Sequence, residues 1–287
     1  MPCQEALAEL ASEAGRISNA DGWQFVSWQA DVRVDPSKLR FGLRQLISDT
    51  ELHLSDCGYA VISFTDLANL CGPNIEAAAI TLFLTALGEP IRVFDQLPFH
   101  WRQIDADLTR PPNRSRGIGL QPLHHDFVNA EYPPDFVCLY SLRPDPLGAG
   151  ASLVSDLKGI ASELPTDILN QLCLPIYADG VVQNLLNVGR DVNPFPVYSP
   201  SAAFQFRYTT NLLENTASES ARAALQKLAP AIEERAVKHR LLAGELLIID
   251  QRRAVHGREP LGDGQELLAP SERRLVLHSF VRRQVNC

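Results

Sequence analysis

The sequence predicts an α+β protein in which helices decorate a largely antiparallel barrel or sandwich. Two patterns predict this class: segments with helical periodicity gather early in the chain, and segments with strand composition gather late. The size agrees, because 287 residues, 45% of them hydrophobic and 21% charged, can bury a core without disulfides or a metal. We expect one domain over residues 1–287, with a helical N-terminal part to about residue 56.

The N-terminal part of the chain carries three segments of helical periodicity and one of strand composition. In the helical segments, apolar residues recur every three or four positions and so share one face. The strand segment is β-branched and aromatic and follows a glycine. The third helical segment ends at Leu87-Gly88, because glycine readily adopts the backbone that stops a helix. The predicted elements are helices over residues 4–16, 37–53 and 73–87 and a strand over residues 58–64.

Two irregular segments interrupt the rest of the chain. Residues 104–122 are polar and contain prolines, glycines and several arginines, and residues 178–211 contain turns with little periodicity. Long segments without regular structure are usually lids or binding loops, so we expect both to form the mouth of a pocket. The other predicted elements are strands over residues 120–128, 136–143, 151–156, 244–250 and 273–283 and helices over residues 157–175 and 219–239.

Charge and cysteine usage exclude several classes of protein. A formal net charge of −8 and a pI of about 5.4 argue against a nucleic-acid partner and against an anionic membrane surface. The first residues lack a basic and then apolar leader, and no apolar run approaches the roughly 18 residues of a membrane span. We therefore expect a cytoplasmic protein. The six cysteines are scattered without a CxxC pair, which disfavours a zinc–cysteine site or a disulfide framework. The oligomeric state is left open.

Three side chains form the candidate metal site. His124 and Asp126 are two positions apart, and residues i and i+2 of a strand point to the same face. His256, from an adjacent strand, could complete a facial array. Two histidines and one carboxylate with open positions suit ferrous iron used for oxygen chemistry. His125, on the opposite face, is expected to be structural.

Two longer blocks carry a family resemblance. From residue 124 to 154 the chain reads HHDFVNAEYPPDFVCLYSLRPDPLGAGASLV, and from residue 241 to 258 it reads LLAGELLIIDQRRAVHGR. The first block contains the H-x-D strand and a second strand that ends in a small-residue turn. The second matches the pattern G-[DE]-x-x-x-x-D-[NQ]-R-x-x-x-H-G-R. Together they resemble the clavaminate synthase-like and taurine dioxygenase-like branch of the Fe(II)/2-oxoglutarate-dependent oxygenases.

The resemblance implies a double-stranded β-helix (jelly-roll) core with flanking helices. It also implies that His124, Asp126 and His256 bind Fe(II), and that 2-oxoglutarate and O2 are cosubstrates. Ser152 matches a hydroxyl position that helps to hold the distal carboxylate of 2-oxoglutarate. In the second block Asp250, Arg252 and Arg258 are expected to be structural, fixing the turn before the last iron ligand and its surroundings.

One departure from the family pattern lies in the last strand. The family carries an R-x-x-x-R pair there, whose second arginine usually grips the distal carboxylate of 2-oxoglutarate. Here the alignment places Arg274 first and His278 second, and an imidazole cannot give the bidentate clamp of a guanidinium. We expect Arg274 to bind this carboxylate, assisted by His278 and Ser152. Arg282, which shares the same strand face, and a one-residue slip of the alignment remain alternatives.

The resemblance implies hydroxylation of an unactivated C–H bond with release of succinate and CO2. Intact Asp126 favours hydroxylation over halogenation, because related halogenases have a small residue at that position. The expected substrate is a small amino-acid- or peptide-derived molecule, in natural-product biosynthesis. Polar candidates for substrate contact are Gln121, Arg207 and Asn211.

Other functions fit parts of the pattern. Desaturation and ring closure start from the same hydrogen abstraction as hydroxylation. The triad could instead bind zinc in a hydrolase, although no zinc motif with a positioned general base is present. A non-catalytic jelly-roll binding protein would explain the irregular arginine pattern. The intact triad argues against it, because burying an unused cluster of polar groups costs free energy.

Overall fold

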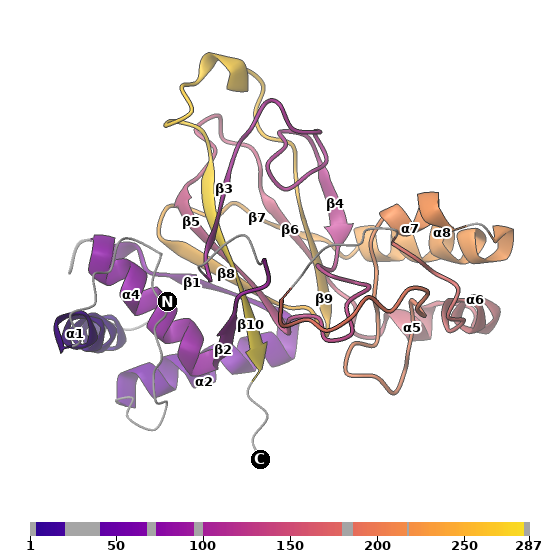
Figure 1. The fold of residues 1–287 in the computed structure, drawn as a ribbon, viewed down its shortest axis with the longest axis horizontal. Helices are drawn as coiled ribbons and strands as arrows, with labels where there is room; N and C mark the ends of the chain where they lie inside the picture. Colours follow the sequence, from indigo (N-terminus) through magenta and orange to yellow (C-terminus); the bar gives the residue numbers. More distant parts are fainter. Residues whose placement is uncertain are drawn as a thin grey trace.

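The computed structural model describes residues 4–20, 41–67, 73–94, 100–179, 186–216 and 218–283. Two antiparallel sheets lie between two groups of helices (Figure 1). The first sheet has the order β1 (Tyr59–Ser63), β8 (Glu245–Asp250), β5 (Phe136–Arg143), β10 (Leu275–Arg283) and β2 (Gly88–Ile91), and β3 (Arg102–Asp105) pairs with the other end of β10. The second sheet has the order β4 (Gln121–His124), β9 (Ala254–Arg258), β6 (Ser152–Asp156) and β7 (Val237–His239).

The central strands of the first sheet are buried on both faces. On β5, Val137 and Leu139 pack between the sheets with Val154 and Ala254 of the second sheet. The alternate residues of β5, such as Tyr140, point to the helices on the outer side. Because successive side chains of a strand face opposite ways, a strand with two buried faces reads as a continuous hydrophobic run.

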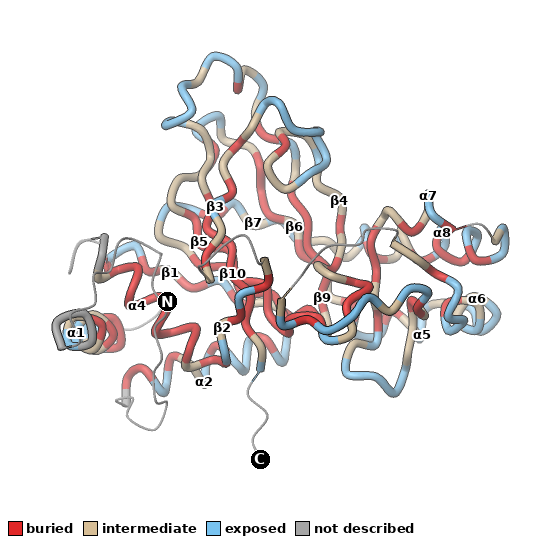
Figure 2. Tube along the Cα trace, viewed as in Figure 1, coloured by how far each residue is buried: buried red, intermediate tan, exposed pale blue. Residues whose placement is uncertain are grey.

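Helices cover the outer face of each sheet. The first sheet is covered by the N-terminal helices α1 (Gln4–Ala20), α2 (Phe41–Cys57) and α4 (Pro73–Leu87). The second sheet is covered by α8 (Glu219–Glu233), with the short helices α5 (Ile160–Glu163), α6 (Thr166–Leu172) and α7 (Asn211–Asn215) beside it. Figure 2 shows the buried residues running along the strands and along the inner faces of these helices.

The predicted mixture of helix and sheet is confirmed, and several boundaries are wrong for identifiable reasons. The predicted helix over 157–175 is two short helices, because Pro165 holds an extended backbone between them. The predicted helix over 219–239 ends at Glu233, and its last three residues are strand β7. The predicted strand over 120–128 ends at His124, where the chain turns and Phe127 takes a φ of 57°.

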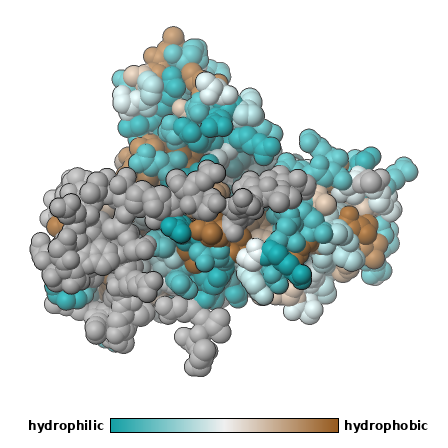
Figure 3. Space-filling view, viewed as in Figure 1, coloured by the Kyte–Doolittle hydropathy of each residue, from teal (hydrophilic) through white to brown (hydrophobic). Residues whose placement is uncertain are grey.

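The remaining differences are smaller. Helix α2 extends to Cys57, and residues 37–40 of its predicted start lie outside the described residues. Strands β2, β3 and β7 were not expected, because segments of three or four residues show no readable alternation. Within the described ranges, no helix is long and apolar enough to cross a membrane. Hydrophilic residues predominate on the described surface in Figure 3.

Candidate metal centre and its cavity

The structure brings the three predicted metal ligands together. His124 is the last residue of β4 and lies in register with His256 of β9, with 4.5 Å between the ring centroids. Asp126 Oδ1 lies 3.6 Å from His124 Nε2, and Asp126 Oδ2 lies 3.6 Å from His256 Nε2. One ligand atom from each residue lies within 4.8 Å of the others. The two histidines project from paired strands, whereas the carboxylate comes from a turn.

The turn that carries Asp126 is held by a buried glutamine. The backbone N–H of Asp126 donates to Gln251 Oε1 at 2.7 Å, and Gln251 Nε2 donates to the Pro134 carbonyl at 2.9 Å. Gln251 follows β8 and is fully buried. Sequence reasoning missed this role, although Gln251 lies in the D-[NQ]-R part of the second block. Its amide places the carboxylate opposite the two imidazoles.

The protonation of the triad suits a divalent cation. His124 Nδ1 lies 2.8 Å from the Pro122 carbonyl and donates to it, which leaves Nε2 to face Asp126. Burial, and then the neighbouring His124, lower the pKa of His256 to about 3. Burial raises the pKa of Asp126, but the neighbouring imidazoles of His124, His256 and His278 outweigh it and lower that pKa. Asp126 Oδ2 and His256 Nδ1 are buried without a hydrogen-bond partner in the described part of the chain. An ionised carboxylate and converging imidazoles are the donors of a 2-His-1-carboxylate iron site, so these residues fit Fe(II).

His125 faces away from the triad, as its expected structural role requires. Its Nδ1 accepts a hydrogen bond from the Tyr208 backbone N–H at 3.0 Å, and the backbone N–H of His125 donates to the Tyr208 carbonyl at 2.8 Å. Burial, and then the charge of His124, lower the pKa of His125 to about 3. The imidazole is therefore neutral in the folded protein and serves as an acceptor for the backbone.

We expect the metal-free protein to lose stability between pH 7 and pH 5. Burial lowers the pKa values of His125 and His256 to about 3 and of His278 to about 4, from 6.5 in the unfolded chain. As the pH falls below 6.5 the unfolded chain takes up these protons first, at a cost to stability of about 1.4 kcal/mol per histidine and pH unit. The pKa of His124 is raised, because Asp126 outweighs burial, so protonation of this residue offsets part of the loss.

The net loss should be on the order of 2–4 kcal/mol in the free energy of unfolding, measured by urea titration at the two pH values. The variant His125→Gln keeps a side-chain acceptor without a titrating ring and should show a smaller loss. Equal stability of the wild-type protein at both pH values would contradict the buried, neutral histidines.

The triad opens into a cavity of about 690 Å³ between the two sheets. The predicted residues Gln121, Asn211, Ser152, Arg274 and His278 all line it. Its other lining residues include aromatic and charged side chains, among them Phe94, Phe127, Phe280, Arg102, Arg114 and Asp179. Residues from both predicted lid segments, 104–122 and 178–211, contribute to this lining. The sequence predicts that these two segments form the mouth of a pocket.

The three predicted substrate contacts differ in position. Gln121 Nε2 lies 3.4 Å from His124 Nε2, beside the metal site. Asn211 Nδ2 donates to Asp179 Oδ1 at 3.2 Å on another wall. Arg207 is absent from the described lining, and its guanidinium donates to backbone carbonyls of residues 128 and 130. This placement does not support a substrate contact by Arg207, which braces the turn after Asp126.

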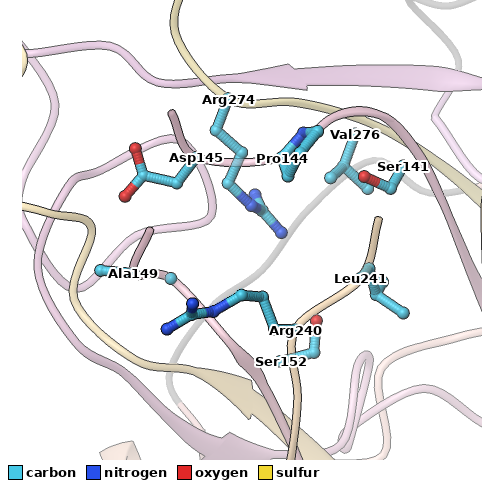
Figure 4. A pocket seen from close by; sticks show the side chains of 10 residues that line it. Ser141, Pro144, Asp145, Ala149, Ser152, Arg240, Leu241, Arg274 and Val276 are labelled. Carbon is cyan, nitrogen blue, oxygen red and sulfur yellow. The ribbon is translucent and has the colours of Figure 1, made fainter. Parts of the chain in front are cut away.

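Arg274 is a half-buried cation with no counter-ion among the described residues. Its side chain reaches into a small second cavity of about 10 Å³, which Ser141, Ser152 and Asp145 also line (Figure 4). No hydrogen bond or ion pair links its guanidinium to any described residue, whereas Asp145 accepts from Gly262 and Gln265. Burial, and then Arg258, lower the pKa of Arg274 to about 9. A guanidinium placed this way is stabilised by an incoming carboxylate.

Arg282 and His278 share the strand face of Arg274 but have different surroundings. Arg282 lies near the end of β10, where its guanidinium donates to the carbonyls of Asn187 and Tyr132, and it does not line the cavity in the described structure. His278 lies in the middle of β10 with its Nε2 3.6 Å from Asp126 Oδ2. Of the alternatives left by the sequence, Arg282 is therefore the one that this geometry disfavours.

Comparison with known proteins finds two curated relatives that are similar in sequence to part of the chain. No family model matches it. Over 190 residues it is 30% identical to L-asparagine oxygenase of Streptomyces coelicolor, a match covering 64% of this chain and 56% of that protein. Over 168 residues it is 30% identical to L-lysine 3-hydroxylase of Catenulispora acidiphila, covering 55% and 44%. The chain is homologous to these oxygenases. The resemblance predicted from the two blocks is confirmed, although the matches span only about half the length of these relatives.

The chain shares its fold with solved structures of two iron oxygenases. Asparagine oxygenase in complex with Fe(II), 2S,3S-3-hydroxyasparagine and succinate gives a TM-score of 0.75 over 97% of this chain and 92% of that chain, at 20% identity. The non-heme iron oxygenase OrfP in complex with Fe and alpha-ketoglutaric acid gives 0.71 over 98% and 92%, at 18% identity. The likeness extends over nearly the whole described chain, including the helices on both sides.

The arginine at the H-G-R end of the second block joins strand β9 to a neighbouring loop. Arg258 Nη2 donates to the carbonyls of Gly117 and Gly119 at 2.6 and 2.8 Å, which ties the first predicted lid segment to β9. At the other end of the block, Asp250 accepts from the Arg252 N–H at 3.0 Å and pairs with Arg283. These contacts agree with the expected structural roles of Asp250, Arg252 and Arg258.

We expect Gly257→Ala to disturb the metal site through the backbone. A Cβ at Gly257 would lie 2.6 Å from the Gln121 carbonyl oxygen and 3.2 Å from the Leu123 nitrogen, so β4 and β9 would have to separate. Overpacking of this kind costs about 1–3 kcal/mol, and it moves His124 away from His256. Thermal unfolding and Co(II) affinity should both fall. Gly15→Ala, in helix α1 where a Cβ has room, is the control and should leave the Co(II) affinity unchanged.

Proposed function

We propose that this chain is an Fe(II)- and 2-oxoglutarate-dependent dioxygenase that hydroxylates an unactivated C–H bond of a small amino-acid-derived substrate, releasing succinate and CO2, in natural-product biosynthesis. The observation that supports this proposal most strongly is the cluster of His124, Asp126 and His256. Their ligand atoms converge beside a large cavity that all three residues line. Two neutral imidazoles and one carboxylate would leave three positions on iron for cosubstrates.

We also propose that residues 1–287 form a single domain with a double-stranded β-helix core. The strand connections support this: along the chain β3, β5, β8 and β10 fall in one sheet, and β4, β6, β7 and β9 fall in the other. Successive strands therefore cross between the sheets at nearly every step. This winding brings β4, β9 and β10, which are far apart in sequence, to one end of the cavity.

The chain's own residues would bind and orient the reactants. When bound, iron with 2-oxoglutarate would supply the activation of O2. Arg274, with Ser152 beside it, would hold the distal carboxylate of 2-oxoglutarate, because its guanidinium lines the cavity and pairs with no anion in the described part of the chain. Gln251 would fix Asp126, and the Pro122 carbonyl would fix the orientation of His124.

The charges of the cavity support an amino-acid substrate. Arg102 lies over the Phe94 ring at 5.0 Å and has no acidic partner among the described residues. Asp179 lines a different wall, and burial raises its pKa although Asn211 donates to it. A carboxylate near Arg102 and an ammonium group near Asp179 would pair both charges. The two curated relatives are named for asparagine and lysine, which agrees with this class.

We expect Arg102→Gln to raise the KM for an amino-acid substrate by roughly 10- to 100-fold, the loss of one charge-assisted hydrogen-bonded pair. The wild-type enzyme should also prefer the free acid over its carboxamide, and the variant should lose that preference. Steady-state rates with both compounds would measure this. A variant that keeps the preference would place the substrate carboxylate elsewhere.

Succinate release tests the proposed activity. The protein loaded with Fe(II) and 2-oxoglutarate would be incubated in air with each common amino acid, and succinate and oxidised product would be measured by mass spectrometry. Substrate-dependent succinate with a product heavier by one oxygen supports hydroxylation, and a product lighter by two hydrogens means desaturation or ring closure. Metal binding without 2-oxoglutarate consumption would favour the zinc alternative, and ligand binding without either would favour a binding protein.

A further inference from the structure

His278 is a buried histidine beside the cluster of candidate metal ligands. It lies in the middle of β10 with 7% of its surface exposed, and neither ring nitrogen has a hydrogen-bond partner among the residues described. Its Nε2 lies 3.6 Å from Oδ2 of Asp126, an atom that is also buried and unpartnered. Buried polar atoms are nearly always paired, so two unsatisfied atoms that face each other just beyond hydrogen-bond distance indicate an interaction.

The geometry separates His278 from the metal ligands themselves. The ligand atoms of His124, Asp126 and His256 lie within 4.8 Å of one another, and His278 does not belong to that group. Its imidazole thus reaches the carboxylate without reaching both of the other imidazoles. A side chain in this position contacts a ligand rather than the metal.

We propose that His278 is a positioning residue: its Nε2–H donates a hydrogen bond to Oδ2 of Asp126 and keeps this carboxylate on the metal through one oxygen only. The inference rests on the proposed iron site. A carboxylate can bind a metal through one oxygen or through both. Binding through both would occupy a position that 2-oxoglutarate or O2 needs, because two histidines and a monodentate carboxylate leave three positions open.

The chemistry of an imidazole suits a directional donor to Asp126. His278 pairs in register with Arg102 of β3, and its Nε2 lies 3.6 Å from Asp126 Oδ2. An imidazole N–H offers the carboxylate one directional hydrogen bond. An arginine at this position would add a full positive charge beside a metal ligand and compete with the cation for the carboxylate.

Co(II) binding tests this role without depending on turnover. His278→Leu removes the donor, His278→Gln keeps an N–H donor, and Ser279→Ala is a control at the next residue of β10. Titration gives the Co(II) affinity, and the visible absorption of Co(II) reports its coordination number. We expect His278→Leu to lose roughly 10- to 100-fold in affinity with a changed spectrum, as for other residues that orient metal ligands. His278→Gln should restore the wild-type spectrum and most of the affinity, and Ser279→Ala should match the wild type.

Each other result would overturn the inference. Wild-type affinity and spectrum in His278→Leu would show that Asp126 needs no such donor. Loss of binding in both variants to the level of His256→Ala would make His278 a ligand. Failure of the wild-type protein to bind Co(II) or Fe(II) would overturn the proposed function as well. Metal binding by the wild type therefore separates an error in the proposed function from an error in the role of His278. Should His278→Leu not fold, His278→Phe keeps a ring of similar size without a donor and takes its place.

Discussion

Alanine at His124 should abolish iron binding, whereas glutamine at the adjacent His125 should leave it intact. His124 offers Nε2 to the cluster with Asp126 and His256, and its Nδ1 is already committed to the Pro122 carbonyl. Without it only two ligands remain, and a pair of ligands holds Fe(II) weakly at neutral pH. We expect the affinity to fall by roughly a thousandfold or more, and succinate release to fall below detection.

The comparison of these two neighbours separates ligation from folding. His125 is as deeply buried as His256, but it faces Tyr208 rather than the metal cluster. His125→Gln should therefore lower the melting temperature without lowering Fe(II) affinity, and His124→Ala should do the reverse. Anaerobic calorimetry with Fe(II), with circular dichroism for stability, measures both. Equal Fe(II) affinity of His124→Ala and the wild type would contradict the assigned site.

Leucine at Arg274 should remove 2-oxoglutarate binding while Fe(II) binding persists. The guanidinium of Arg274 lines both cavities and has no partner within the described chain. Two charge-assisted hydrogen bonds to a carboxylate contribute about 3–5 kcal/mol, so the Kd for 2-oxoglutarate should rise roughly 10²- to 10³-fold. Arg274→Lys should recover only part of this, because an ammonium group cannot pair in the bidentate manner.

Arg282 provides the matched control on the same strand. It has the same side-chain parity on β10, but its guanidinium is engaged by the Asn187 and Tyr132 carbonyls. Arg282→Leu should leave the 2-oxoglutarate Kd within about twofold of the wild type, since surface changes remote from a site have small effects. Anaerobic titration of the iron-loaded proteins gives both constants. An effect confined to Arg282→Leu would move the carboxylate site to the other end of β10.

The cluster of candidate metal ligands could be predicted from sequence because the information is local. The spacing of His124 and Asp126 and the block around His256 each occupy a few residues. Strand spacing alone nevertheless does not explain the position of Asp126. This residue projects from a turn beyond β4 and is held there by Gln251 from the β8–β9 connection. A contact between residues 125 positions apart leaves no periodic signal in a single sequence.

The choice between Arg274 and Arg282 could not be made from strand parity, because both share one face of β10. Only the pairing of β10 with β3 at one end and with β2 at the other shows which arginine meets the cavity. The position of the Arg207 side chain could not be predicted for a related reason. It lies in a predicted lid segment, but the fold turns its guanidinium toward backbone carbonyls behind Asp126. Short strands such as β3 depend on such pairing and are not visible as patterns.

An anaerobic titration of Fe(II) and then 2-oxoglutarate tests the central claim most directly. Chelation of Fe(II) by 2-oxoglutarate gives a weak visible metal-to-ligand charge-transfer band, and its appearance requires both the metal ligands and the cosubstrate site. The account predicts a saturable band in the wild-type protein and none in His256→Ala. Iron that binds without producing the band, or a band that survives in His256→Ala, would contradict it.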